Sequence, residues 1–179
     1  NKSEPLISSN DFSNESFKKT IHNDTISILG YGPQGRSQAL NLRDNNFNIT
    51  LGLRKDGNSW NKALKDGWIA NTNLFEIDEA TYRGTIVKYL LSDIGQIEQW
   101  RKVKDNLHSN DTLYFSHGFG IHYHEYTHIN PPDDINVIMI SPKCSGNTVR
   151  KNFLNKKGFM ASYAIYKDYT GESLDKIIA

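Results

Sequence analysis

The sequence predicts an α/β fold in which a doubly wound, mostly parallel sheet carries helices on both faces. Two observations along its 179 residues lead to this fold class. Short apolar runs of strand-like composition alternate with segments in which apolar residues recur at helical spacing. A glycine-rich turn also joins the first of these runs to the first helical segment. Because ligands of such sheets bind beyond the carboxyl ends of the strands, the residues that follow each run are the candidate functional residues.

The chain is expected to comprise a polar lead-in over residues 1–23, with a short helix over residues 12–20, and one α/β domain over residues 24–179. Strands are expected where apolar, β-branched and aromatic residues stand together. In chain order these runs are residues 26–29, 47–53, 85–91, 112–115, 135–140 and 159–166. Strands that alternate with helices are typical of a parallel sheet covered on both faces. We also expect the sheet to lack its last strand, which would follow residue 179.

Helices are expected where apolar residues recur three or four positions apart. Trp60 and Leu64 share one helix face in this way. The helical segments are residues 34–45, 59–65, 77–82, 96–107 and those that follow residue 171. Lys88 does not fit its strand, because an unpaired ammonium is costly in an apolar run. Either its alkyl stem lies along apolar surface with the ammonium in water, or that strand is less buried than expected.

The turn after the first strand has its glycines in the spacing G-x-G-x-x-G, at Gly30, Gly32 and Gly35. Gly30 permits a tight turn, Gly32 lets the backbone approach a pyrophosphate, and Gly35 lets the helix pack closely on the strand. The free N–H groups and the dipole of the helix N-terminus then favour the phosphates. Such a spacing recurs by chance, but here strand, turn, helix and second strand stand in the required order. The sequence therefore predicts a Rossmann-type, dinucleotide-binding domain.

The residues at the end of the second strand indicate which cofactor is bound. An NAD site usually has Asp or Glu about twenty residues past the glycines, where it binds the ribose 2′-OH. This chain has Arg54 and Lys55 there, followed by Ser59. A guanidinium makes paired, charge-assisted hydrogen bonds to a phosphate, and a hydroxyl can add another. The favoured cofactor is therefore NADPH; without the glycines, both cations would be read as solvated charges at a strand end.

Composition argues against several classes of protein. The net charge is +1 and the basic residues are spread along the chain, so nothing favours nucleic-acid binding. No apolar segment approaches the length of a membrane span, and the N-terminus lacks the apolar stretch of a signal peptide. The single cysteine, Cys144, excludes an internal disulfide and fits a reducing compartment. We expect a soluble, cytoplasmic protein that binds neither nucleic acid nor a membrane.

Segments spread along the chain resemble ketol-acid reductoisomerase, also called acetohydroxy acid isomeroreductase, the NADPH- and magnesium-dependent enzyme of valine and isoleucine biosynthesis. They are GYGPQG (30–35), NLRD (41–44), LRKDGNSW (53–60), DGW (66–68), LLSDIGQ (90–96), LYFSHGFG (113–120), SPKCSG (141–146) and ASYAIYKDYTG (161–171). The resemblance runs from residue 25 to residue 171, in order and with compatible spacing. It implies that this chain is the N-terminal, NADPH-binding domain of such an enzyme.

The resemblance also implies a reaction and a set of site residues. A magnesium-dependent alkyl migration in 2-acetolactate or 2-aceto-2-hydroxybutyrate precedes reduction by NADPH to a 2,3-dihydroxy acid. The residues that match catalytic positions are His117 and Lys143. Those that match cofactor-binding positions are Gly30, Tyr31, Gly32, Pro33, Gln34, Gly35, Arg54, Ser59, Asp93, Ile94, Gly95, Gln96 and Gly146. A 2-acetohydroxy acid is thus the expected substrate, and the oligomeric state, a homo-oligomer included, stays open.

The chain also departs from the family's pattern. In the family, carboxylates of an all-helical C-terminal domain hold two Mg²⁺ ions, and this sequence offers no substitute cluster of oxygen ligands. Mg²⁺ is therefore expected as a family requirement whose ligands are not in this chain. Arg36 and Ser37 after the last glycine, and Gly95, are smaller departures. The alternative function is a stand-alone NADP-binding protein or an inactive remnant that lacks the metal domain.

Other polar residues have simpler explanations than chemistry. His122, His124 and His128 suggest zinc, but zinc needs three or four converging ligands, and a solvated loop is the simpler interpretation. Cys144 has no identifiable base and is expected to be inert. His117 follows a strand at the expected nicotinamide end; its role as base, donor or scaffold stays open.

Overall fold

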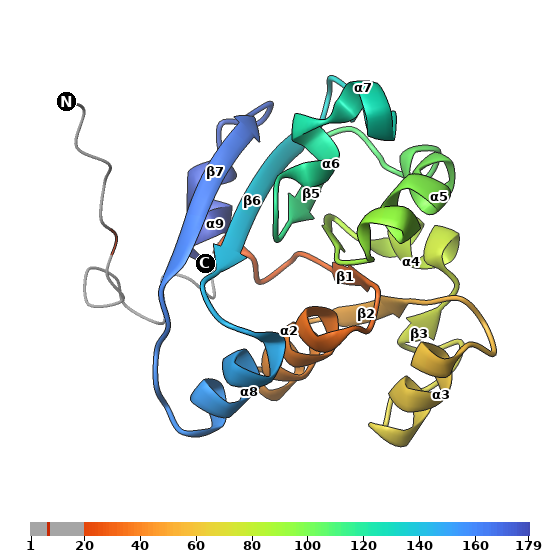
Figure 1. Ribbon diagram of the computed structural model, residues 1–179, viewed down its shortest axis with the longest axis vertical. Coiled ribbons are helices and arrows are strands. Elements are labelled where there is room, and N and C mark those ends of the chain that lie inside the picture. The colour runs from red at the N-terminus through yellow and green to blue at the C-terminus, as the bar shows by residue number, and fades with distance from the viewer. Residues whose placement is uncertain (1–6, 8–19) are drawn as a thin grey trace.

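The computed structural model describes Ile7 and residues 20–179, and these residues form a seven-stranded sheet with helices on both faces (Figure 1). The strands are β1 (Ile26–Leu29), β2 (Ile49–Gly52), β3 (Leu74–Phe75), β4 (Ile86–Tyr89), β5 (Thr112–Phe115), β6 (Asn136–Pro142) and β7 (Ala161–Lys167). The helices are α2 (Pro33–Asp44), α3 (Asn58–Lys65), α4 (Ile77–Arg83), α5 (Asp93–Lys104), α6 (Phe119–His122), α7 (His124–Thr127), α8 (Gly146–Leu154) and α9 (Ser173–Ile178).

The strands lie in the order β3-β2-β1-β4-β5-β6-β7. Neighbouring strands from β3 to β6 are parallel, and β7 pairs antiparallel with β6. The chain runs outward from β1 to β3 and then returns to β4 on the other side of β1, so the strand order reverses between β1 and β4. The predicted doubly wound, mostly parallel α/β fold is confirmed.

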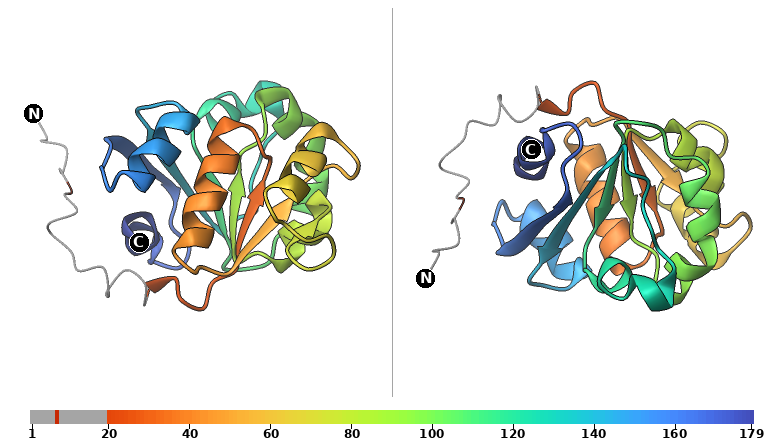
Figure 2. Two further views of the ribbon diagram at one scale, coloured as in Figure 1. Left: turned by 90° about the horizontal axis from the view of Figure 1, so that it is seen from below. Right: turned by 90° about the horizontal axis from the view of Figure 1, so that it is seen from above.

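Successive residues of the strands pack into separate cores on the two faces of the sheet. Ile28 of β1 lies with Ala39 of α2 in one core, and both are fully buried. Leu29, the next residue, lies in the other core with Trp100 of α5. The two views of Figure 2 accordingly show α2 in front of the sheet from one side and α5 from the other. Strands buried on both faces explain why their sequences read as apolar runs.

Several elements differ from the sequence-based expectation. β3 was missed because its two residues, paired with Leu51 and Gly52, are too few to show a period. α8 was missed although Ser145 caps it by accepting a hydrogen bond from the N–H of Thr148 (3.3 Å). The expected histidine-rich loop contains the short helices α6 and α7. The described residues supply six parallel strands and the antiparallel β7, and the further strand expected after residue 179 stays a prediction. Apart from Thr20, the helix expected over residues 12–20 lies outside the described residues.

Lys88 occupies the middle of β4, between the fully buried Val87 and Tyr89. Its own side chain is half-buried, and its ammonium lies 4.1 Å from the centre of the Tyr114 ring. Burial lowers the pKa of Lys88 to about 7. Neither sequence-based alternative describes it fully, because the strand is buried and the ammonium lies over an aromatic face rather than in open water.

Candidate functional site

A cavity of about 480 Å³ lies beyond the carboxyl ends of β1, β2 and β4, where the strand order reverses. Its lining residues fall within four segments of the chain: residues 30–32, 53–59, 76–77 and 90–102. A concave site of this size at this place in a doubly wound sheet is typical of a small-molecule or cofactor site.

The glycine turn forms one end of the cavity, and each glycine has its own structural reason. Gly30 has a φ of +103°, and a Cβ there would lie 2.6 Å from the carbonyl oxygen of Leu90. A Cβ on Gly35 would collide with the carbonyl oxygen of Gly30, so Gly35 allows α2 to pack on the turn. A Cβ on Gly32 would instead have open space around it. No side chain in the described part of the chain caps α2 there, so its first N–H groups are available to an anion.

Arg54, Asn58 and Ser59 form another wall, at the end of β2 and the start of α3. All three are exposed. α3 follows Gly57 as α2 follows Gly32, so both helices begin at the cavity wall. Two helix N-termini and a guanidinium make this cavity suited to a ligand with separated anionic groups. Lys55, expected beside Arg54, lines a different cavity.

Ile94 and Gly95 line the cavity from the first turn of α5. Ile94 is 68% exposed, so the cavity has an apolar side chain at its mouth. Gln96 is instead only 2% exposed, and its side-chain amide donates to the carbonyl oxygen of Tyr89 (3.0 Å). The structure therefore places Gln96 in the core, where it connects α5 to β4, and does not place it in the cavity lining.

Asp93 and His117 lie next to each other beyond the ends of β4 and β5. The distance from His117 Nε2 to Asp93 Oδ1 is 3.4 Å, and both side chains are about half exposed. Ser116, beside His117, accepts a hydrogen bond from the Gln38 amide of α2 (3.3 Å). Lys143 is exposed beyond the end of β6. The structure thus brings together Asp93 and His117 but places neither of them, nor Lys143, in the lining of the 480 Å³ cavity.

Pro33, Gln34 and Gly146 meet where the loop after β6 packs on the first turn of α2. The Gln34 amide donates to the carbonyl oxygen of Cys144 (3.0 Å). A Cβ on Gly146 would collide with the backbone of Pro33, so the start of α8 approaches α2 as closely as a glycine allows. These three residues connect the glycine turn to the β6 end of the sheet.

Some lining residues were missed in the sequence: Glu76, Ile77, Glu98, Gln99 and Lys102. Glu76 follows β3, which is too short to be recognised. Glu98 and Lys102 stand four and eight positions after Ile94, so all three share one face of α5. That spacing was present in the sequence, but the predicted helix began at residue 96 and left Ile94 outside it.

Within the described part of the chain, no group of three or more His, Cys, Asp or Glu residues is placed to hold a metal ion. The zinc alternative for His122, His124 and His128 therefore has no support there. None of the described helices has the length and apolar character needed to span a membrane.

The fold and the cavity define the chain as a dinucleotide-binding domain of the Rossmann class. The family model described as "Acetohydroxy acid isomeroreductase, NADPH-binding domain" matches residues 20–179. The chain therefore belongs to this family, and the resemblance found in the sequence motifs is confirmed.

Known relatives agree with this assignment. The chain is 48% identical over 157 residues to "Ketol-acid reductoisomerase, mitochondrial" of Neurospora crassa, covering 88% of this chain and 39% of the relative. It is 45% identical over 176 residues to "Ketol-acid reductoisomerase (NAD(+))" of Desulfosudis oleivorans, covering 98% and 50%. The structure of an "NADH-preferring ketol-acid reductoisomerase" from an uncultured archaean superposes with a TM-score of 0.86 at 30% identity, covering 98% and 51%. The chain thus spans about half the length of these relatives or less.

Proposed function

We propose that this chain is the NADPH-binding part of a ketol-acid reductoisomerase acting in valine and isoleucine biosynthesis. The observation that carries the proposal is that the glycine turn and the Arg54–Ser59 segment line the same cavity. The turn at Gly32 suits a pyrophosphate, and Arg54 with Ser59 suits a 2′-phosphate. We also propose a cytoplasmic location, on the strength of the single cysteine.

The proposed reaction converts 2-acetolactate or 2-aceto-2-hydroxybutyrate to a 2,3-dihydroxy acid. When bound, NADPH supplies the hydride for the reduction. His117 exchanges a proton with the substrate, and Asp93 orients the imidazole through Nε2. Lys143, exposed past β6, offers a cation to the substrate carboxylate. We assign no Mg²⁺ ligand to this chain, because its described residues contain no suitable group; the metal-dependent alkyl migration needs carboxylates from elsewhere.

NADPH is proposed over NADH although two relatives carry NAD or NADH in their names. Arg54, just after β2, and Ser59, in the first turn of α3, both line the cavity and offer donors to a 2′-phosphate. Glu76 also lines the cavity and, as an acceptor, is suited to hydroxyl or amino groups of the adenosine. The preference for NADPH or NADH therefore depends on whether Arg54 and Ser59, or Glu76, lie against the adenosine ribose.

Gly32 offers a test that separates cofactor binding from folding. We expect the Gly32→Val variant to fold, because nothing lies within 4 Å of the added Cβ, and to lose NADPH binding, because its side chain fills the pyrophosphate position. Gly158→Val is the matched control, since a Cβ there also meets nothing within 4 Å and Gly158 does not line the cavity. Fluorescence titration with NADPH gives the result. Equal affinity of the two variants would contradict the proposed site.

A further inference from the structure

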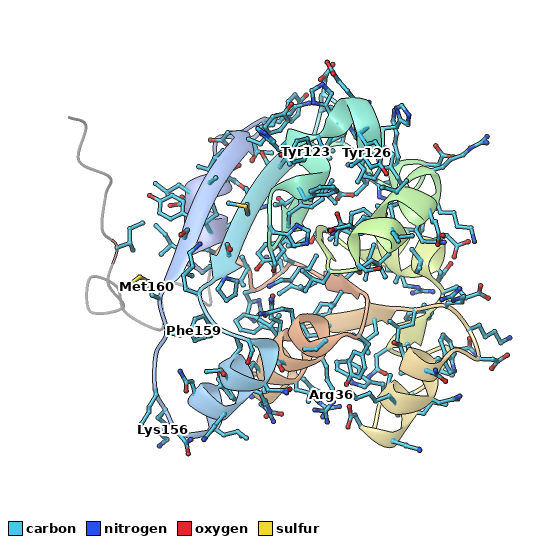
Figure 3. All side chains as sticks on the ribbon, in the orientation of Figure 1. Arg36, Tyr123, Tyr126, Lys156, Phe159 and Met160 are labelled. Atoms are coloured by element: carbon cyan, nitrogen blue, oxygen red, sulfur yellow. The ribbon has the colours of Figure 1, made fainter. Side chains whose placement is uncertain are left out.

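Asp66 stands at the carboxyl end of α3 and accepts hydrogen bonds from two other elements. Arg36 of α2 donates to both carboxylate oxygens, from Nε to Oδ2 (2.6 Å) and from an Nη to Oδ1 (2.8 Å). The Tyr31 hydroxyl also donates to Oδ2 (2.9 Å). Figure 3 shows Arg36 in the gap between α2 and α3, where its side chain reaches toward α3. A bidentate arginine–carboxylate pair fixes direction as well as distance.

Tyr31 connects this pair to the cavity. It belongs to the glycine turn, lines the cavity, and is only 3% exposed. Its hydroxyl also accepts a hydrogen bond from the buried indole N–H of Trp68 (2.8 Å). The Arg43 guanidinium of α2 lies 4.8 Å from the Trp68 ring centre and donates to the Asp66 carbonyl oxygen (2.9 Å). The residues just after α3 are therefore connected by hydrogen bonds both to α2 and to the glycine turn, which precedes α2 in the chain.

The charges in this group favour one another. Its hydrogen bonds with Arg36 hold the pKa of the Asp66 carboxyl below its usual range, against the opposing effect of partial burial. The same carboxylate raises the pKa of Arg36. Burial, with the hydrogen bond to Asp66, raises the pKa of Tyr31, so its hydroxyl stays protonated and keeps donating. The group thus holds one charge state across the neutral range.

α3 carries this anchor at one end and part of the cavity wall at the other. Asn58 and Ser59 line the cavity from its first turn, and Asp66 follows its last residue. Eight helical residues span about 12 Å, so a tilt of about 10° at the Asp66 end would move Ser59 by about 2 Å. A shift of that size exceeds the tolerance of a hydrogen bond to a phosphate oxygen.

We infer that Asp66 is a positioning residue of the dinucleotide site, which fixes the α3 N-terminus relative to the glycine turn by binding Arg36 and Tyr31 together. The inference rests on the proposed NADPH-binding function. A positioning role differs from general stabilisation in one respect. Its loss weakens the binding of NADPH, whose phosphates would contact both the glycine turn and the N-terminus of α3, more than it weakens the binding of NADH.

The test measures dissociation constants for NADPH and NADH, with melting temperatures, for the unmodified chain and its variants. Asp66→Asn removes the charged bidentate pair. Asp44→Asn is the matched control, because Asp44 pairs with Arg150 (2.6 Å) between α2 and α8, away from the cavity. We expect Asp66→Asn to weaken NADPH binding about tenfold and NADH binding less than threefold, while Asp44→Asn changes neither by more than twofold. Arg36→Gln, at a half-exposed position, serves if Asp66→Asn does not fold, and the same selective loss is expected.

Three outcomes would overturn the inference. Unchanged NADPH affinity in the folded variants would remove any positioning role. An equal loss for NADPH and NADH that follows the fall in melting temperature would reduce Asp66 to a stabilising residue. If the unmodified chain did not bind NADPH at all, the proposed function would fail and this inference with it, whereas the first two outcomes leave the proposed function intact.

Discussion

At the scale of single residues, Arg54 decides the proposed cofactor preference. It lines the cavity at the end of β2 with Ser59 close by in the wall. A hydrogen bond to a charged group contributes roughly 1.5–3 kcal/mol. We therefore expect the unmodified chain to bind NADPH about tenfold or more tightly than NADH, and Arg54→Asp to abolish that difference by weakening NADPH far more than NADH. Titration of both cofactors measures it, with Lys55→Asp as the neighbouring control; equal affinities in the unmodified chain would remove Arg54 from the 2′-phosphate position.

Lys88 predicts an unusual dependence of stability on pH. Its pKa is about 7 in the folded chain and about 10.5 when unfolded, so the unfolded chain binds more protons between these values and stability rises with pH across this window. Lys88→Met should raise the free energy of unfolding by about 1–3 kcal/mol at pH 7, with the gain shrinking toward pH 10. Denaturant unfolding at both pH values gives the result. Lys151→Met, at an exposed position of α8, is the control; a gain that does not change with pH would contradict the burial of the ammonium.

At the scale of elements, the contact between α8 and α2 depends on Gly146. A Cβ there would collide with the Pro33 backbone, which cannot move as a flexible side chain would. We expect Gly146→Val to lower the free energy of unfolding by about 1–3 kcal/mol and to disturb the first turn of α2. Thermal unfolding measures this, and Gly158→Val should leave the melting temperature unchanged, because its Cβ meets open space. Equal melting temperatures for the two variants would show that α8 does not pack as described.

The elements predicted from the sequence are those with enough residues to show a period. The strands around Ile28 and Val87 and the helix around Trp100 were predicted from their apolar residues. Burial on one or both faces of an element places apolar residues at regular spacing along its sequence. The two-residue β3 has no such pattern, and with it Glu76 was missed. Gln96 shows a different limit, since a buried glutamine that connects α5 to β4 has the same sequence signal as one that faces a ligand. Asp66 was outside the predicted site for a third reason: its partner Arg36 becomes its neighbour only once α2 and α3 pack together.

At the scale of the whole molecule, the fold supplies a dinucleotide cavity and no metal centre in its described part. In the proposed reaction the alkyl migration develops negative charge on oxygen, which metal ions stabilise. The chain spans about half the length of its relatives or less. We therefore expect the purified 179-residue chain to bind NADPH but not to oxidise it with 2-acetolactate, even at saturating Mg²⁺. The absorbance of NADPH, followed over time after 2-acetolactate and Mg²⁺ are added, measures this. A magnesium-dependent loss of NADPH that is faster than in a control with the Mg²⁺ chelated would contradict the prediction.

The most direct test of the central claim is a crystal structure of this chain grown with NADPH. The account predicts the pyrophosphate against the N–H groups at Gly32 and the start of α2, and the 2′-phosphate within hydrogen-bond distance of Arg54 and Ser59. It also predicts the adenosine beside Ile94, at the mouth of the cavity. NADPH bound at another place on the surface, or bound in this cavity with its 2′-phosphate directed away from Arg54 into solvent, would contradict the account.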